Sequence, residues 1–303
     1  MRGLELSRRF WEELLRPALE EQRPELLHRI AAGLCGGGSD CLGYDDEISR
    51  DHAFFAGCMV FIPGDEEREI GYALSEIYDR LPRAFLGFPT EHRSRQGDGR
   101  YGVKTIEGFF TPLTGRPGAP EGWREWLSIP ESYLAEAAAG EVFFDGPGTF
   151  TRIREEIRTG MSEDVRLKKL AARAALMAQS GQYNFSRCRR HGEEYAARLA
   201  ADQFVRETLG MVFLLNRRYM PYYKWAFRAL RELERLSELA EPLGSILIDP
   251  QEETIEAVSA AVIAELKRQG LTAGSWDYLE PHAYEITKHI RGAEIAALHV
   301  MEG

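Results

Sequence analysis

The chain of 303 residues is 44% hydrophobic and 28% charged, an ordinary globular composition whose length fits one large or two modest domains. Its formal net charge of -10 at pH 7 repels a phosphate backbone, so a long nucleic acid is a disfavoured partner, although a local basic cleft could still bind one nucleotide. No apolar run approaches the roughly 18 residues of a membrane-spanning helix, so no membrane association is expected.

The N-terminal segment has the pattern of helices and lacks that of a targeting signal. Its first residues, MRGLELSRRFWEELL, mix charges among the apolar positions and lack the continuous apolar core of a signal peptide. Apolar residues at helical spacing predict one or two helices over about 5–31, broken near Pro24. The chain has four cysteines and no CxxC pair, so we expect reduced thiols and a cytoplasmic location.

Strand-like segments come next in the first half of the chain. A short apolar strand over 30–34 runs into the turn Gly36-Gly37-Gly38, and a buried strand is predicted over 53–62. After this strand we expect a helix over 65–81, a polar loop over 88–100 and a third strand over 101–110.

The second half of the chain has a different composition. From about residue 129, alanine, leucine, arginine and glutamate dominate, and helical periodicity persists to the end. Helices are expected near 130–139, 149–158, 163–180, 186–216, 221–240, 251–269 and 281–300. The predicted fold class is therefore α+β, with an N-terminal mixed sheet and flanking helices followed by an all-helical C-terminal domain. We place the two domains at 1–135 and 136–303.

The glycine-rich turn is the first candidate for chemistry. Glycine lets the backbone approach a phosphate closely, and exposed N–H groups together with the Ser39 hydroxyl could hold its oxygens. Gly37, Gly38 and Ser39 are therefore predicted to bind a nucleotide. A triple glycine alone also fits an ordinary tight turn, so a second signal elsewhere in the chain is needed to support nucleotide binding.

Asp51 comes twelve residues after Ser39, at the start of the next apolar strand. A carboxylate at a strand edge facing a glycine turn suits Mg²⁺, which prefers a few carboxylates plus phosphate oxygens and waters. The order Gly-Ser, then Asp, then an apolar strand resembles the polymerase-β-type nucleotidyltransferase pattern. That pattern has Asp-x-Asp and a carboxylate on a third strand, and Glu107 is the candidate for the latter.

One position departs from this pattern. The second carboxylate of Asp-x-Asp would fall at residue 53, where this chain has Ala53, which cannot bind a metal ion. Three explanations remain open: a deliberate inactivating substitution, a natural protein that only binds nucleotide, or another acid, Asp45 or Asp46, that substitutes for the missing ligand. The predicted metal ligands are therefore Asp51 and Glu107, with one ligand missing.

Longer phrases sharpen the resemblance. They are GLCGGGSDCLGYDDEISRDH, IPESYLAEAAAGEVFFDGPGTFTRIREEI, KKLAARAALMAQSGQYNFSRCRR and LLNRRYMPYYKW. Together they resemble the bacterial domain of unknown function numbered 4037, over about residues 4–236. This resemblance implies a nucleotidyltransferase-superfamily fold and a nucleotide-linked activity, but it implies no particular substrate. The family has an acidic or other polar residue where this chain has Ala53.

The helical half adds further candidates, each with a structural alternative. Gln182 and Asn184 either line the nucleotide pocket or belong to a capped turn between two helices after a break at Ser180-Gly181. Lys224 and Tyr223 either contact the triphosphate and the base or sugar, or form an aromatic patch at the start of a helix.

Glu194 is the remaining candidate, as a catalytic base for the acceptor, although its position on a helix favours a solvated face over this role.

The sequence as a whole favours an enzyme. It would be a magnesium-dependent nucleotidyltransferase that moves a nucleoside monophosphate from a nucleoside triphosphate such as ATP to a small-molecule acceptor, with release of pyrophosphate. The alternative is a catalytically impaired nucleotide-binding protein on the same fold, because of Ala53. The acceptor and the oligomeric state, a homodimer included, are left open.

Overall fold

The computed structural model describes residues 1–48, 55–90 and 100–303. The chain divides into two compact units. The sheet unit comprises Met1–Pro120 and Glu136–Gly160, and the helical unit comprises Glu121–Ala135 and Met161–Gly303. Every strand that the structure describes lies in the sheet unit. The predicted α+β class, a mixed sheet with flanking helices followed by a helical part, is therefore confirmed.

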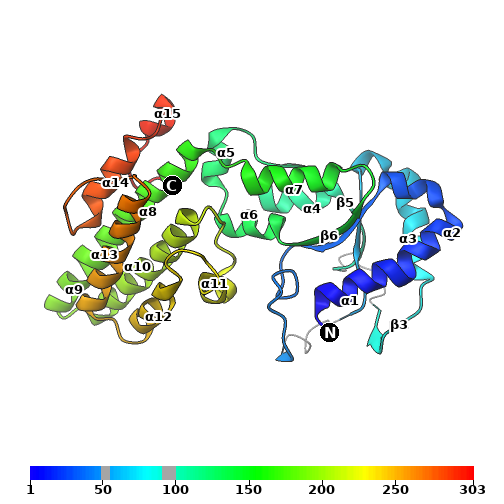
Figure 1. The fold of residues 1–303 in the computed structure, drawn as a ribbon, viewed down its shortest axis with the longest axis horizontal. Helices are drawn as coiled ribbons and strands as arrows, with labels where there is room; N and C mark the ends of the chain where they lie inside the picture. The colour runs from blue at the N-terminus through cyan, green and yellow to red at the C-terminus, as the bar shows by residue number, and fades with distance from the viewer. Residues whose placement is uncertain (49–54, 91–99) are drawn as a thin grey trace. The chain divides into compact units, whose positions relative to one another are not determined.

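A four-stranded mixed sheet lies at the centre of the sheet unit (Figure 1). Its strands, in the order β5-β2-β1-β6, are β1 (Ala31–Cys35), β2 (Met59–Ile62), β5 (Gly102–Thr105) and β6 (Gly140–Asp145). The central strand β1 is antiparallel to both neighbours, whereas β2 and β5 are parallel. Two short strands, β3 (Ala84–Phe85) and β4 (Phe88–Pro89), form a separate antiparallel pair.

Helices pack against this sheet, as Figure 1 shows. The α-helices of the sheet unit are α1 (Gly3–Phe10), α2 (Arg16–Gln22), α3 (Tyr72–Asp79), α4 (Ile106–Thr114) and α7 (Thr149–Thr159). Short 3₁₀ and π turns join them at Trp11–Leu15, Pro24–Arg29, Gly64–Glu66 and Glu67–Gly71. The predicted helical N-terminus broken near Pro24 is confirmed, because α2 ends at Gln22 and Pro24 begins the 3₁₀ turn.

Aromatic side chains cover both faces of the sheet. Ala31 and Ala32 are neighbours in β1 and therefore point to opposite faces; they pair with Phe61 and Phe144. On one face, Phe61 stacks on Phe150 of α7 with ring centroids 3.9 Å apart. On the other, Phe144 stacks on Trp11, which follows α1. Because it is covered on both sides, β1 is buried along its whole length.

The division into units differs from the predicted boundary at residue 135. Residues 136–160 belong with the sheet, because β6 pairs with β1 along its length and α7 packs on the same sheet. The helix α6 (Glu131–Ala138) contains the point at which the chain passes from one unit to the other. The all-helical region therefore begins in sequence at α5 (Gly122–Ser128) and is interrupted by β6 and α7.

The predicted third strand over 101–110 is too long. The strand β5 ends at Thr105, and α4 begins at the next residue. The side chain of Thr105 is the physical cause, because it accepts a hydrogen bond from the backbone N–H of Gly108 at 3.0 Å and so caps the helix. Glu107 consequently lies on a helix and not on a strand.

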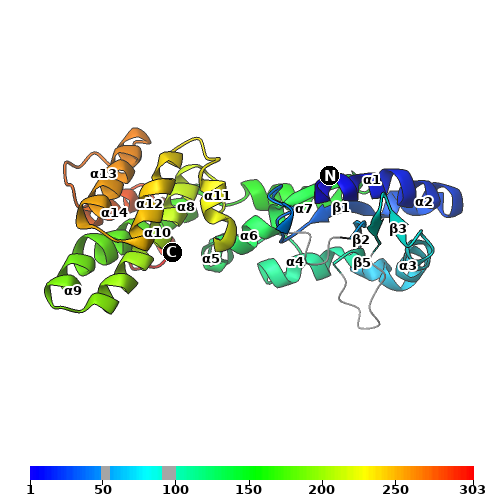
Figure 2. The ribbon, with the colours of Figure 1, turned by 90° about the horizontal axis from the view of Figure 1, so that it is seen from below.

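The helical unit contains most of the remaining helices (Figures 1 and 2). Besides α5 they are α8 (Glu163–Met177), α9 (Ser186–Arg190), α10 (Glu194–Leu215), α11 (Tyr223–Leu230), α12 (Ala240–Ile248), α13 (Glu252–Arg268), α14 (Leu279–Thr287) and α15 (Ala293–Ala296), with a 3₁₀ turn at Ser237–Leu239. The helix α8 packs against α10 and α14. Across the described ranges, every helix is too short or too polar to cross a membrane.

The predicted break at Ser180-Gly181 is wrong. A π-helix (Ala178–Phe185) continues α8 into α9 without interruption. Gly181 is needed there because a Cβ at this position would lie 2.3 Å from the ring of Phe204 in α10. The absence of a side chain thus lets the π-helix pack closely on α10, and the sequence signal taken for a turn is a packing requirement.

The aromatic stack beneath α7 should dominate the stability of the sheet unit. Replacing the fully buried Phe61 by alanine removes its contacts with Phe150 and leaves a cavity, so we expect the free energy of unfolding to fall by about 3–5 kcal/mol. Urea denaturation measures it. Tyr72→Ala is the control, because Tyr72 is 78% exposed and its loss should change the free energy by less than about 0.5 kcal/mol. Equal losses in the two variants would contradict this account of the core.

Candidate functional site

The glycine turn comes directly after the carboxyl end of β1. Gly36 and Gly38 have φ angles of 98° and 130°, which side chains other than glycine rarely adopt. Gly37 is exposed and Ser39 is half-buried. Within the described part of the chain, the backbone N–H groups of Gly37, Gly38 and Ser39 donate no hydrogen bond. Three amides at one turn are thus available to an external acceptor.

Arg100 fixes one side of this turn. Its guanidinium donates to the carbonyl oxygen of Gly37 at 3.1 Å and to Oδ1 of Asp40 at 2.5 Å. Asp40 is 5% exposed and also accepts from the backbone N–H of Cys41. Burial lowers the pKa of Arg100, but the facing Asp40 carboxylate outweighs burial, so this pKa lies above its ordinary value and the guanidinium stays charged. The pair holds the turn while leaving about a third of the Arg100 side chain exposed.

The position of Gly38 leaves no room for a side chain. A Cβ there would lie 2.6 Å from a guanidinium nitrogen of Arg100 and 2.7 Å from Oδ1 of Asp40. The φ angle and the close approach of the ion pair therefore both require glycine at this position.

Glu136 of α6 lies against the same turn, and sequence reasoning missed it. A Cβ on Gly37 would meet its two carboxylate oxygens at 2.8 and 3.3 Å. The pairing of Cys35 with Gly140 accounts for this proximity, because the carboxyl end of α6 comes just before the start of β6. The register of a strand that was not predicted brings Glu136 to the turn, so the sequence alone carried no signal for it.

Glu107 does not reach the glycine turn. Its carboxylate lies beside Gly64, where a Cβ would be 2.9 Å from Oε2 of Glu107. Gly64 lies just past the carboxyl end of β2 and Gly36 just past that of β1, and these strands are antiparallel. Glu107 and the turn therefore lie at opposite ends of the sheet, roughly 15 Å apart along β1. Glu107 was predicted to be the carboxylate of a third strand; it lies on α4 instead, and its role as a metal ligand stays a prediction.

The described residues do not form the predicted magnesium site. Asp51 and Ala53, together with His52 between them, lie outside the described residues. Within the described ranges, no three His, Cys, Asp or Glu side chains gather closely enough to hold a metal ion. Glu107 is separated from the turn, and Ala53 offers no ligand atom. Because Asp51 lies outside the described residues, the assignment of Asp51 and Glu107 to one Mg²⁺ site stays a prediction.

The remaining predicted residues belong to the helical unit. Gln182 has a structural role: its Nε2 donates to Glu256 at 2.7 Å, and its Oε1 accepts from the backbone N–H of Leu279 at 2.8 Å. It thereby ties the π-helix to α13 and α14. Asn184 is half-buried in the same π-helix.

Three further predicted residues are exposed at helix starts. Glu194 is the first residue of α10, and Tyr223 and Lys224 begin α11. The ring of Tyr223 lies 4.3 Å from that of Tyr222, and the Lys224 ammonium lies 5.0 Å from the ring of Trp225. An exposed aromatic group beside a cation remains consistent with ligand binding, and the assignment of these residues to a nucleotide stays a prediction.

The helical unit contains a buried cluster of charges that sequence reasoning did not identify. Glu131 and Lys169 are only 6% and 4% exposed, and the Lys169 ammonium lies 3.3 Å from Oε1 of Glu131. Arg173 forms ion pairs with both Glu131 and Glu207. Burial raises the pKa of Glu131, but Arg173 and Lys169 outweigh it and hold this pKa below its ordinary value. The cluster joins α6, α8 and α10 through charge pairs shielded from water.

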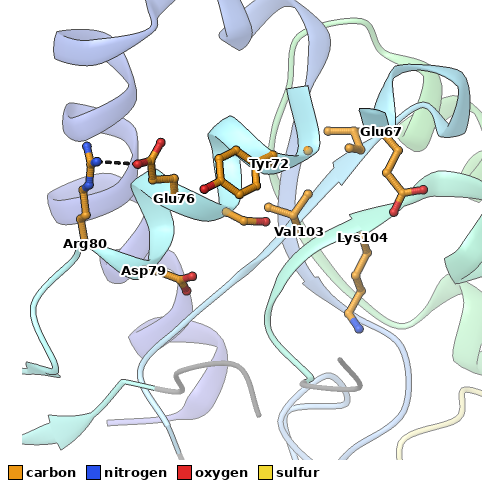
Figure 3. A pocket seen from close by; sticks show the side chains of 10 residues that line it. Glu67, Tyr72, Glu76, Asp79, Arg80, Val103 and Lys104 are labelled. Carbon is orange, nitrogen blue, oxygen red and sulfur yellow. Dashed lines mark hydrogen bonds and ion pairs between the residues drawn. The ribbon is translucent and has the colours of Figure 1, made fainter. Parts of the chain in front are cut away.

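A separate hollow of about 470 Å³ lies against the outer strand β5 (Figure 3). Its wall consists of Ile62, Glu67, Gly71, Tyr72, Ser75, Glu76, Asp79, Arg80, Val103 and Lys104. Figure 3 shows Glu76 paired with Arg80 at 2.5 Å on α3, and Lys104 extending from the β5 side. Its lining comes from β2, β5 and the helical segment between them and includes no residue of the glycine turn, so the two sites are distinct. Its mixed charges favour no single class of ligand.

The comparisons with known proteins agree with part of the sequence interpretation. Residues 126–226 match the family described as Domain of unknown function (DUF4037). The predicted resemblance is confirmed over this segment, about a third of the chain, and not over the whole of 4–236. The matched segment includes α6 with Glu136 and the buried charge cluster, but not the glycine turn. No match is found among curated proteins.

One solved structure is similar. It is a nucleotidyltransferase-like protein from Exiguobacterium sibiricum 255-15, determined at 1.90 Å, with 11% sequence identity and a TM-score of 0.38. The likeness covers 90% of this chain and 80% of that chain. A TM-score of this size does not establish a shared fold.

The buried charge cluster generates a stability prediction. Glu131→Gln should lower the free energy of unfolding at about pH 7 by about 3–5 kcal/mol, because it leaves Lys169 and Arg173 buried without their shared partner. The folded-state pKa of Glu131 is depressed, so its contribution is present above the unfolded value of about 4.3 and is lost as the pH falls through the folded value.

The difference in stability between the two proteins should therefore narrow as the pH falls from about 7 to about 3, as measured by denaturation followed with circular dichroism. Glu234→Gln is the matched control, because the Glu234 side chain is 85% exposed and its substitution should have little effect at either pH. A Glu131→Gln variant as stable as the wild type at neutral pH would contradict the role of this ion pair.

Proposed function

We propose that the glycine turn of the sheet unit binds the phosphates of a nucleoside triphosphate, and that the chain has a nucleotidyltransferase-type function. The observation that carries this proposal is the set of three unbonded backbone amides at Gly37, Gly38 and Ser39, held beside the charged Arg100. Backbone N–H groups that converge on one point form an anion site without any side-chain charge. The Ser39 hydroxyl adds a fourth donor at the same turn.

The position of the turn in the fold supports this function. A turn at the carboxyl end of a buried strand is held rigidly, because β1 pairs with a strand on each side. Rigid amides lose little freedom when a ligand binds, so more of the interaction energy appears as affinity. The overall charge of -10 would repel a polyphosphate over long distances, and binding would then depend on these short-range contacts.

Two functions are compatible with nucleotide binding at the glycine turn. The first is transfer of a nucleoside monophosphate to a small-molecule acceptor with release of pyrophosphate, in which Asp51 would take part as the sequence predicts. The second is nucleotide binding without transfer, and two observations favour it: Ala53 replaces a carboxylate, and Glu107 lies at the other end of the sheet. Nucleotide binding at the turn is common to both, and it is the part of the proposal that the geometry supports best.

The first test changes the turn itself. Gly38→Ala should weaken the binding of ATP by at least about tenfold, because alanine disfavours a φ of 130° and its methyl group would displace Arg100. Isothermal titration calorimetry measures the affinity, and thermal unfolding reports on the fold.

The matched control is Gly115→Ala. Gly115 also has a positive φ, of 77°, but a Cβ there meets nothing within 4 Å, and the residue ends α4. This variant should bear a comparable backbone strain and still bind ATP as the wild type does. If both variants bind equally well, the turn is not the nucleotide site.

The second test separates transfer from binding. If the missing carboxylate limits catalysis, Ala53→Asp should raise magnesium-dependent pyrophosphate release from ATP by at least about tenfold over the wild type. Ala53→Asn is the control, because asparagine has nearly the same size as aspartate but no charge. This variant should leave the rate unchanged. Equal rates in all three proteins would show that residue 53 does not limit transfer.

A further inference from the structure

The carboxylate of Glu136 lies beside Gly37 of the glycine turn, and no charged side chain of the described residues pairs with it. Its oxygens lie 2.8 and 3.3 Å from the position of a Cβ on Gly37. Within the described part of the chain, this carboxylate makes no hydrogen bond or ion pair. Glu136 is half-buried, so water screens it only in part. Among the described residues, an unpaired negative charge thus lies beside the turn at which we propose that the phosphates bind.

The other charges near the turn do not cancel it. Arg100 is already paired with the buried Asp40, which uses the positive charge on that side. Arg154 donates to the carbonyl oxygens of Ala138, Ala139 and Gly140, just beyond the end of α6. Among the residues that the structure describes, these two sets of interactions leave Glu136 as the uncompensated charge beside the turn.

Arg158 is also engaged elsewhere. It donates to the carbonyl oxygen of Ala138 at 3.0 Å and forms an ion pair with Glu155. Both arginines of α7 that approach α6 therefore satisfy backbone carbonyls and leave the carboxylate of Glu136 uncompensated.

This charge opposes a bare polyphosphate. A nucleoside triphosphate brings several negative charges to the turn, and like charges within a few ångströms repel strongly where water is partly excluded. A divalent cation bound to the phosphates reverses the sign of the interaction with Glu136, since carboxylates and phosphate oxygens are the ligands that hard cations prefer. The same carboxylate would then attract the ligand that it otherwise repels.

We propose that Glu136 is a specificity-determining residue that makes the glycine turn accept a nucleoside triphosphate only as its complex with a divalent cation. The inference rests on the proposed function, because it presupposes that the triphosphate binds at this turn. It also replaces Glu107 by Glu136 as the carboxylate of the described residues that meets the nucleotide. The tight contact between Glu136 and Gly37 accounts for glycine at the middle position of the turn.

The test compares ATP binding with and without magnesium in variants of the full chain. Isothermal titration calorimetry is run with a non-hydrolysable ATP analogue, once in excess Mg²⁺ and once in EDTA. In the wild type, the affinity in EDTA should be at least about tenfold weaker. In Glu136→Gln, the affinity in EDTA should rise and the gap should shrink to less than about threefold, because the repulsive charge is removed.

Two further variants make this assignment specific. Glu136→Asp retains the charge and should retain the dependence on Mg²⁺. Glu141→Gln is the matched control: Glu141 is exposed on β6 and pairs with Arg8, so its loss should leave both affinities unchanged. Thermal unfolding of each variant verifies that it is folded.

The outcomes separate the two proposals. If the wild type binds the analogue but Glu136→Gln keeps the full gap between Mg²⁺ and EDTA, the role of Glu136 is overturned while nucleotide binding stands. A Glu107→Gln variant that removes the gap in place of Glu136→Gln would overturn it as well. If the wild type does not bind the analogue in either condition, the proposed function fails.

Discussion

The antiparallel pairing of β1 with both of its neighbours is the constraint on which the site depends. Because β1 runs against β2 and β6, its carboxyl end meets the amino ends of those two strands. The amino end of β5 lies at the same end of the sheet, because β5 is parallel to β2. Residues just before β5 and β6, Arg100 and Glu136, therefore converge on the turn after β1. Glu107, which follows the carboxyl end of β5, is carried to the opposite end of the sheet by the same pairing.

The sequence could supply the turn but not its surroundings. Three consecutive glycines after an apolar run are a local signal, because both the strand and the turn that ends it depend on residues that are close in sequence. Glu107 was misplaced for a local reason too: YGVKTIEGFF alternates as a strand does, but the Thr105 hydroxyl caps a helix that starts one residue later. Glu136 could not be found this way, since its place is set by the register of β6 on β1, more than one hundred residues apart in sequence. Register depends on side chains from several elements at once.

Buried polar groups in the helical unit illustrate the same limit. Periodicity assigns charged residues to the solvated face of a helix, and for most of the chain this assignment predicts the helices well. Lys169 and Arg173 are one turn apart on α8, yet they face inward, because Glu131 supplies a buried partner from another helix. Gln182 is half-buried, and Glu256 and Leu279 likewise provide partners for its hydrogen bonds from distant helices. Such inward polar groups are tolerated only when partners from distant segments are present, which one sequence does not reveal.

The charges around the turn explain how an acidic protein could bind an anionic ligand. Arg100 and Asp40 cancel each other, so among the described side chains the net charge beside the turn is that of Glu136. Attraction for phosphate must then come from backbone amides, which bear partial charges that cannot titrate and are directed by the turn itself. Amides alone do not distinguish a bare anion from one neutralised by a cation, whereas amides beside an unpaired carboxylate do. In the proposed site, three free backbone donors beside one carboxylate without a partner among the described residues would select a ligand that carries both charges, which is why the proposal gives Glu136 a role beside that of the glycines.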